Sequence, residues 1–339
     1  MKHKIIVAGC GSMSKAWIEH AKTRDDAEIV GFMDIRKESA EAAAQKFAVS
    51  APAFTDLAEA IRATGASIVF DVTIPAAHKK TVLTALNNGC HVFGEKPMAD
   101  SLPDARTMTN AAVRAKKTYA VMQNRRYLKN IRAFRETLTS GKIGTPGFFT
   151  ADFFIGAHFG GFRDAMESPL VLDMAIHTFD QARFIIGADP VAVYCREFNP
   201  PGSWYKGAAA AVCTFEFENG IMFSYRGSWC AEGLNTSWEA VWRVTGSSGS
   251  AIWEGSGMPY GETVVPSAEK KFKSDTARFD VTPGWNGREG HNGCLDEMFS
   301  ALNEGRSPET VCTDNIKSVA MVFAAIESSR KGKRVHVRF

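Results

Sequence analysis

The stretch KIIVAGCGSMS, residues 4–14, carries the pattern that decides the fold of the N-terminal part of the chain. An apolar run typical of a buried strand leads directly into two glycines spaced as in the phosphate-binding turn G-x-G-x-x-G. Gly9 supplies the tight turn, and Gly11 lets a pyrophosphate approach the backbone at the start of a helix, where free N–H groups favour an anion. Ser14 replaces the third glycine, and because that position serves helix packing, a small serine is tolerated.

Strands and helices alternate from this motif to about residue 125. Helical patterns separate the apolar runs, and the last of these helices opens at Ser101 and Pro103. The alternation predicts a parallel sheet covered on both faces, and therefore an α/β first domain over residues 1–125. The predicted strands lie at residues 4–8, 28–34, 67–73, 90–97 and 118–123.

Beyond residue 144 the pattern changes to longer, aromatic, alternating strands. Cys213, Phe215 and Phe217 point to one side of a predicted strand, and Asn219-Gly220 is a type I′ turn signal that predicts an antiparallel hairpin. We therefore expect an α+β second domain over residues 126–339, with an antiparallel sheet and helices on one side. Its further predicted elements are a second hairpin at residues 238–255, a loop at residues 255–290, and helices at residues 294–305 and 315–330.

The composition is that of an ordinary globular protein. A length of 339 residues favours two domains, and 23% charged residues with a net charge of +3 imply neither a nucleic-acid partner nor a membrane-surface partner. Seven cysteines without a C-x-x-C pair predict reduced thiols, no disulfide, no metal site and a cytoplasmic location. No apolar stretch approaches the roughly 18 to 20 residues of a membrane span.

Asp34 ends the second predicted strand, 20 residues past Ser14. At this spacing a carboxylate accepts hydrogen bonds from the ribose hydroxyls of NAD, and its charge repels the 2′-phosphate of NADP. Arg36 and Lys37 partly offset that repulsion, and a solvated turn residue is the alternative interpretation of Asp34. The sequence favours NAD over NADP. The candidate cofactor contacts in this region are Gly9, Gly11, Ser12, Met13, Asp34 and Arg36.

Two further motifs lie at the carboxyl ends of predicted strands, where open α/β sheets bind ligands. One is Glu95-Lys96-Pro97, in which Pro97 biases Lys96 toward an extended conformation and is compatible with a cis peptide bond. A lysine held in this way can hydrogen-bond a substrate hydroxyl, and a solvent-exposed lysine is the alternative. The other motif is TIPAAH, residues 73–78, in which His78 is equally well explained as a helix N-terminal residue. The candidate cofactor contacts of the two motifs are Thr73, Pro75, His78, Glu95 and Lys96.

The segment LDMAIHTFD, residues 172–180, is an apolar helical pattern that carries ionisable residues at i, i+4 and i+7. These residues are Asp173, His177 and Asp180, and on a regular α-helix they share one stripe. A surface stripe in which Asp173 and His177 pair, worth a few tenths of a kcal/mol, is one interpretation. A functional stripe is the other, with Asp180 in a structural role.

Together these motifs resemble the Gfo/Idh/MocA family, the glucose–fructose oxidoreductase and inositol dehydrogenase group. The resemblance covers nearly the whole chain in the expected order. It implies a Rossmann first domain, a second domain whose open, mainly antiparallel sheet often builds oligomers, and NAD(P)-dependent hydride transfer on sugars or polyols. We therefore expect a homodimer or homotetramer. The motifs that carry the resemblance are GCGSMS, Asp34, TIPAAH, Glu95-Lys96-Pro97, NRRY at residues 124–127, and Asp173-x-x-x-His177.

The resemblance implies that the Asp173/His177 stripe faces the nicotinamide and meets Lys96. A neutral imidazole is well matched to accept an alcohol proton near pH 7, so His177 is the predicted general base. Lys96 would hold the reacting oxygen, and Asp173 would orient the substrate or the lysine. Whether Lys96 or His177 accepts the proton stays open at this point. The candidate substrate contacts are Arg126, Tyr127, His158 and Arg163.

The leading prediction is an NAD-dependent dehydrogenase acting on a secondary alcohol of a sugar, an inositol or a sugar derivative. One alternative is an enzyme of the same family that uses NAD transiently to assist glycosidic cleavage. Another alternative is a non-catalytic sensor of sugar and nucleotide. Because both Lys96 and His177 are present, the sequence favours catalysis over sensing.

Overall fold

Two separate sheets organise the chain, which a computed structural model describes at residues 2–269 and 271–339. The first unit contains the residues up to Asn124 together with Arg288–Val319 and Phe339. The second unit contains Arg125–Gly287 and Ala320–Arg338. Each unit is described by itself below.

The first sheet has six parallel strands in the order β3-β2-β1-β4-β5-β6. This order confirms the predicted parallel α/β domain of Rossmann type. The chain reverses its direction of travel across the sheet between β1 and β4, and such switch points bind ligands at the carboxyl ends of the strands. The strands are β1 (His3–Ala8), β2 (Ala27–Met33), β3 (Ala53–Phe54), β4 (Ile68–Asp71), β5 (His91–Gly94) and β6 (Tyr119–Val121).

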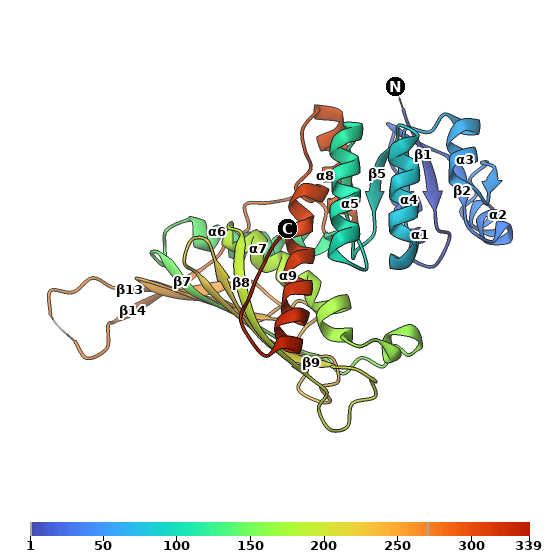
Figure 1. The fold of residues 1–339 in the computed structure, drawn as a ribbon. Helices are drawn as coiled ribbons and strands as arrows, with labels where there is room; N and C mark the ends of the chain where they lie inside the picture. Colours follow the sequence, from blue (N-terminus) through green and yellow to red (C-terminus); the bar gives the residue numbers. More distant parts are fainter. Residues whose placement is uncertain (1, 270) are drawn as a thin grey trace. The chain divides into compact units, whose positions relative to one another are not determined.

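Helices connect these strands and pack beside them (Figure 1). The prediction of five strands missed β3, because a two-residue edge strand leaves no apolar run. It also missed the helix that follows, although Asp56 caps that helix by accepting a hydrogen bond from the Glu59 N–H at 2.7 Å. The helices are α1 (Ser14–Lys22), α2 (Lys37–Lys46), α3 (Leu57–Thr64), α4 (Pro75–Asn87) and α5 (Leu102–Ala115).

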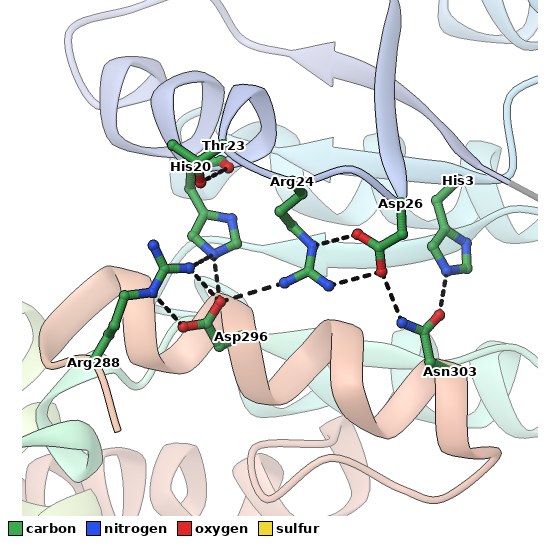
Figure 2. A network of polar contacts seen from close by, with 8 residues as sticks. All are labelled: His3, His20, Thr23, Arg24, Asp26, Arg288, Asp296 and Asn303. Carbon is green, nitrogen blue, oxygen red and sulfur yellow. Dashed lines mark hydrogen bonds and ion pairs between the residues drawn. The ribbon is translucent and has the colours of Figure 1, made fainter. Parts of the chain in front are cut away.

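A polar network joins α1 to α8 (Gly290–Glu304), as Figure 2 shows. His20 of α1 contacts Asp296 of α8 at 3.0 Å, and Arg288 donates to the same carboxylate at 2.6 Å. Arg24 donates two hydrogen bonds of 2.8 Å to Asp26 and a longer one of 3.3 Å to Asp296. Burial raises the pKa of Asp296, but the hydrogen bonds from Arg288 and His20 outweigh it and lower this pKa below its ordinary value. The carboxylate therefore stays ionised inside the network.

Apolar contacts, in addition to the polar network, join α8 to the first sheet. Phe299 of α8 lies edge-on to Phe70 of β4 and Phe93 of β5, at ring-centroid distances of 6.1 and 5.3 Å. The sequence placed residues 288–319 in the second domain, whereas the structure groups them with the first sheet. The reason is that α8 buries its apolar face against the first sheet, a pairing that sequence order does not reveal.

The second sheet has nine strands in the order β14-β13-β12-β11-β7-β10-β9-β8-β15. All neighbours are antiparallel except β7 and β10, so the predicted open, mainly antiparallel sheet is confirmed. The hairpin predicted at Asn219-Gly220 joins β9 and β10, with Phe215 paired with Phe223 on the buried face. The strands are β7 (Pro146–Phe154), β8 (Pro190–Phe198), β9 (Ala210–Phe217), β10 (Met222–Ser228), β11 (Val241–Gly246), β12 (Gly249–Trp253), β13 (Tyr260–Val264), β14 (Thr276–Asp280) and β15 (Val335–His336).

The prediction of a loop over residues 255–290 is wrong in part. The strands β13 and β14 pair antiparallel there and form one end of the sheet (Figure 1). Most residues of β14 are exposed, so this edge strand needs no apolar alternation, and the sequence therefore gives no strand signal.

Helices cover one face of the second sheet. Phe179 of α7 (Ala175–Ile186) packs edge-on against Phe215 and Tyr225 at ring-centroid distances of 4.8 and 5.3 Å. Phe134 of α6 (Lys129–Thr139) stacks on Phe149 of β7. Every residue of α7 is buried, so this helix forms the centre of the second core. The long helix α9 (Cys312–Lys331) contributes residues to both units.

Candidate active site

The glycine turn after β1 is built as the sequence predicts. Gly9 has a φ of 88°, and a Cβ at this position would lie 2.5 Å from the carbonyl oxygen of Val72, so only glycine fits. A Cβ on Gly11 would meet no atom within 4 Å, which leaves its backbone open to a ligand. Ser14 is 1% exposed and donates a 2.7 Å hydrogen bond to the Gly11 carbonyl. The first residues of α1 thus present main-chain N–H groups beside an open turn, as a pyrophosphate requires.

Asp34 directly follows β2 and is held by main-chain donors. Its carboxylate accepts the Cys10 N–H at 2.9 Å and the Arg36 N–H at 3.0 Å. Burial, followed by the Asp34 charge, raises the pKa of the Cys10 thiol to about 12, so this thiol stays neutral. A pocket of about 450 Å³ opens at this point, within the range of small-molecule sites. Its lining includes Gly9, Gly11, Asp34, Arg36, Thr73 and Lys80.

The predicted contacts Ser12 and Met13 lie in the same turn. Ser12 lines a second hollow of about 270 Å³, and the Met13 side chain is 47% exposed. The residues predicted from the glycine turn and from Asp34 therefore surround accessible space within the first unit. This arrangement fits NAD, because an uncapped helix start and a ribose-binding carboxylate lie in one region.

The residues of the TIPAAH motif after β4 lie in two places, some at the pocket and some in the core. Thr73 lines the pocket and donates to Asp71 at 2.6 Å. His78 is 1% exposed and its Nδ1 contacts the same carboxylate at 2.9 Å. Burial lowers the pKa of His78, but the charge of Asp71, its hydrogen bond and the charges of Glu95 and Asp100 together outweigh burial, so this pKa lies above its ordinary value. His78 therefore fixes Asp71 from the core rather than facing the pocket, and Pro75 begins α4.

Glu95 holds the backbone that carries Lys96. Trp17, which is fully buried, donates its indole N–H to Glu95 at 2.8 Å, and the Lys96 N–H donates to the other carboxylate oxygen at 3.2 Å. Glu95 is 7% exposed and supports Trp17 and the Lys96 backbone, and a contact of its side chain with the cofactor stays a prediction. The Lys96-Pro97 peptide bond is cis, which is the conformation the sequence allowed. Lys96 itself is half-buried at the carboxyl end of the sheet.

In the second unit the predicted stripe is divided by a change of helix type. Residues Leu170–Met174 form a π-helical turn, a rare element that is frequent at functional sites, and α7 begins only at Ala175. Because a π turn winds more residues per turn than an α-helix, Asp173 does not follow the 3.6-residue stripe of α7. Asp173 accepts a 2.6 Å hydrogen bond from Arg163, and His177 is 7% exposed on α7. Because His177 is buried, the two residues do not form the solvent-exposed surface stripe of the first interpretation.

Asp180 belongs to the core. It accepts two hydrogen bonds from Arg126, at 2.6 and 2.7 Å, and the two side chains are 2% and 6% exposed. Tyr127 is 2% exposed and packs near Trp285, with ring centroids 6.4 Å apart. Both side chains are therefore buried beside these partners, and a contact of Arg126 or Tyr127 with substrate stays a prediction.

The other two predicted substrate contacts lie on the glycine-rich loop after β7 and are accessible. The side chain of His158 is 61% exposed, stacks on Trp204 at a centroid distance of 3.6 Å, and contacts Glu232 at 2.7 Å. Arg163 is 30% exposed at its side chain while it holds Asp173. The structure thus brings Arg163 to Asp173, and it pairs His158 with Trp204 and Glu232.

A group of polar contacts around Arg125 was not predicted from the sequence. Its guanidinium lies 3.6 Å from Glu239 and donates to the main-chain oxygen of Trp238, and Gln181 of α7 donates to Glu239 at 3.0 Å. The only signal was the presence of Arg125 in NRRY, because nothing in the sequence marks Glu239 as its partner. This support fixes the loop that carries Trp238 against α7.

Within residues 2–269 and 271–339, no group of three or more His, Cys, Asp or Glu side chains is placed to hold a metal ion. In the same part of the chain, no helix has the length and apolar character to cross a membrane.

Comparison with known proteins gives matches over most of the chain. The Gfo/Idh/MocA oxidoreductase family with an NAD-binding Rossmann fold matches residues 3–123, and the C-terminal domain of the same family matches residues 131–252. The chain is similar to 1,5-anhydro-D-fructose reductase of Ensifer adhaerens, with 24% identity over 97% of each protein. It is also similar to D-apiose dehydrogenase of Paraburkholderia graminis, with 26% identity over 99% of this chain and 90% of that protein.

A solved structure has the same fold over nearly its whole length. It is an oxidoreductase from Agrobacterium radiobacter in complex with NAD⁺, L-tartaric acid and magnesium, with a TM-score of 0.86 and 24% identity over 99% of each chain. At this identity the likeness shows the fold alone.

Proposed function

Because the chain belongs to the Gfo/Idh/MocA family of NAD-binding oxidoreductases, we propose that it transfers a hydride between NAD and a secondary alcohol of a sugar, an inositol or a sugar derivative. The observation that carries the proposal is the pocket of the first unit, where the open Gly11 turn and the Asp34 carboxylate lie together. The relatives named for anhydrofructose and apiose support a sugar or polyol as the substrate class.

The residues of the first unit would hold the cofactor at its phosphates and at one ribose. The N–H groups at the start of α1 bind the pyrophosphate, and Asp34 accepts the ribose hydroxyls. The charge of Asp34 favours NAD over NADP, although Arg36 lines the same pocket. When bound, the nicotinamide supplies the acceptor for the hydride.

We assign the proton chemistry to Lys96 and His177. Oxidation of an alcohol requires its hydroxyl proton to leave as the hydride departs, and an imidazole is suited to accept it near pH 7. His177 is the base in this proposal, and Lys96, held by Glu95, stabilises the developing alkoxide. Asp173, fixed by Arg163, accepts a hydrogen bond from a neighbouring hydroxyl and orients the ring. A Lys96 base is the alternative assignment.

The test is NADH formation from NAD across a panel of sugars, inositols and their acids. With an active compound, Lys96→Ala and His177→Gln should each lower kcat by about 10²- to 10⁴-fold, the usual effect of a lost general base or charge stabiliser. NAD binding, measured by calorimetry, should persist in both variants. Lys331→Ala, an exposed lysine paired with Glu327, is the matched control and should behave as wild type. A wild-type protein that binds no nicotinamide cofactor would end the proposal.

The two alternative functions gain nothing from the comparisons. NAD-assisted glycoside cleavage would release an aglycone with no net NADH. A sensor would bind a sugar and nucleotide without turnover. The same panel therefore separates all three, provided that aglycone release is followed together with NADH.

We also propose that a second copy of the chain covers the outer face of the second sheet, giving a homodimer or homotetramer. Phe148, Tyr194 and Val212 are 47%, 53% and 44% exposed on this face, on neighbouring or nearby strands. An apolar surface of this kind is usually buried in an interface. Light scattering should give a mass at least twice that of one chain. A cytoplasmic location remains a prediction from the cysteine pattern.

A further inference from the structure

We propose that an aromatic subsite beside Asp173 binds the apolar aglycone of a glycoside, so that the preferred substrates are glycosides rather than free sugars. This inference rests on the proposed function and names its substrate class. The aromatic subsite consists of Phe159 and Phe162 on the loop after β7, Trp229 after β10, and Trp238 before β11. All four residues belong to the second unit.

Phe159 contacts two tryptophan rings of the aromatic subsite, which come from loops distant in sequence. Phe159 lies 5.5 Å from Trp229 and 6.0 Å from Trp238 between ring centroids, at tilted angles. Phe159, Phe162 and Trp238 are 52%, 63% and 43% exposed, whereas Trp229 is 2% exposed and forms the floor. Large aromatic side chains normally bury such area, so exposed rings clustered on a floor indicate a surface that a ligand covers.

Arg163 connects the aromatic subsite to the candidate catalytic residue Asp173. Its guanidinium lies over the rings of Phe159 and Phe162, at 5.1 and 4.7 Å from their centroids. The same side chain donates its Nε–H to Asp173 at 2.6 Å. Because Arg163 contacts both Asp173 and these two rings, a sugar whose hydroxyl binds Asp173 would place its substituents near the aromatic rings.

The floor of the subsite is held before any ligand binds. Trp229 stacks on Tyr205 with centroids 5.7 Å apart and ring planes within 11°, and Tyr205 donates its hydroxyl to the Ala157 carbonyl at 2.8 Å. Arg125 donates to the main-chain oxygen of Trp238 and so fixes the opposite wall. Because these rings are already ordered, a ligand loses little of its binding energy to ordering them.

The exposed area of the three outer rings favours a small ligand over a protein partner as the occupant of the subsite. A fully buried aromatic side chain covers about 150–250 Å², so three rings that are about half exposed offer roughly 300 Å². A stable protein interface needs about 800 Å² from each partner. The subsite is therefore sized for a single apolar or aromatic ring, and the nearby Asp173 and Arg163 supply the polar contacts for the sugar to which that ring is joined.

The experiment compares methyl and p-nitrophenyl glycosides of glucose, galactose and mannose as matched pairs. In the wild-type protein with NAD, the p-nitrophenyl compound should have a kcat/KM about 3- to 10-fold above that of its methyl partner, the range expected for one or two aromatic contacts. In the Phe159→Ala/Trp238→Ala double variant, this ratio should fall close to one. Phe272→Ala removes an aromatic ring that is fully exposed elsewhere in the second unit, and it should keep the wild-type ratio.

Binding is measured in parallel, so that failure of turnover and failure of the subsite are distinguishable. Saturation-transfer NMR of the p-nitrophenyl glycoside on NAD-saturated protein should show transfer to the aryl protons in wild type and not in the double variant. Should the double variant not fold, as judged by circular dichroism, the single variant Phe162→Ala replaces it. Absence of aryl transfer in wild type, or an unchanged ratio in a folded variant, overturns the subsite. A drop in molecular mass of the variant would overturn it too, because the rings would then form an interface between copies.

Discussion

Two arginine–aspartate pairs of the second unit share the same chemistry and differ in exposure. In the Arg126–Asp180 pair the side chains are 6% and 2% exposed and are joined by two hydrogen bonds. In the Arg163–Asp173 pair they are 30% and 12% exposed and joined at 2.6 Å. The first pair lies in the core against α7, and the second lies at the edge of the aromatic subsite.

Burial, rather than residue type or spacing, is what distinguishes the two pairs. A charge that is buried must keep its partner, because an unpaired buried charge costs several kcal/mol. A partly exposed pair costs less to break than a buried one, so its aspartate can exchange a contact with the arginine for one with a ligand. We therefore assign Asp180 to stability and Asp173 to substrate orientation.

The largest expected effect is on stability, from Asp180→Ala. The substitution leaves the buried Arg126 charge without its carboxylate, which should lower the free energy of unfolding by about 3–5 kcal/mol. Urea unfolding measures it. The double variant Arg126→Met/Asp180→Leu, which removes both charges, should recover most of the loss. A single variant within about 1 kcal/mol of wild type would remove the distinction between the two pairs.

The matching change in the other pair, Asp173→Asn, should act on turnover instead. A lost hydrogen bond to a charged group is worth about 1.5–3 kcal/mol, so kcat/KM should fall by roughly 10- to 100-fold. The free energy of unfolding should change by less than about 1 kcal/mol, because the Arg163–Asp173 pair is partly exposed. The comparison fails if Asp173→Asn unfolds as readily as Asp180→Ala while its turnover is unaffected.

A smaller effect is expected at Glu197 of β8, a carboxylate that accepts from the Ser168 hydroxyl at 3.2 Å rather than from an arginine. Burial raises the pKa of Glu197 from 4.5 to about 7. The folded state then keeps a proton that the unfolded state releases, so the free energy of unfolding falls as pH rises from about 4.5 to 7. A shift of this size corresponds to about 3 kcal/mol, and because solvent reaches part of this half-buried side chain the expected loss is on the order of 1–2 kcal/mol.

Glu197→Gln should flatten this part of the pH profile, as measured by unfolding at a series of pH values. Glu218→Gln, a change at an exposed carboxylate of the same unit, is the control and should leave the profile unchanged. A profile that keeps its slope in Glu197→Gln would show that burial of this carboxylate is not its cause.

The first unit was the more predictable of the two because its site is local in sequence. Gly9, Gly11 and Asp34 lie within one strand–helix–strand segment, and the backbone geometry that they require is visible in residue type and spacing alone. The position of α8 was not predictable, because Phe299 packs on strands more than 200 residues away in sequence, a contact without local signal.

The second unit was less predictable because its residues owe their roles to burial. The spacing of Asp173, His177 and Asp180 predicts one stripe of a regular α-helix. The π turn at Leu170–Met174 interrupts the 3.6-residue period, and no residue type in the sequence indicates a π turn. The partner of Arg126 was not predictable, because Asp180 lies 54 residues further along the chain. The aromatic subsite was missed because its rings come from separate loops.

The central claim is that an alcohol hydrogen passes directly to NAD at this site. It is tested most directly by incubating the protein with NAD and with sugars or inositols that carry deuterium on their carbinol carbons, and then weighing the NADH by mass spectrometry. Direct transfer predicts NADH that holds a single deuterium for each carbonyl formed, with the signal lost in Lys96→Ala. Unlabelled NADH, or a released aglycone with no labelled NADH, would contradict it.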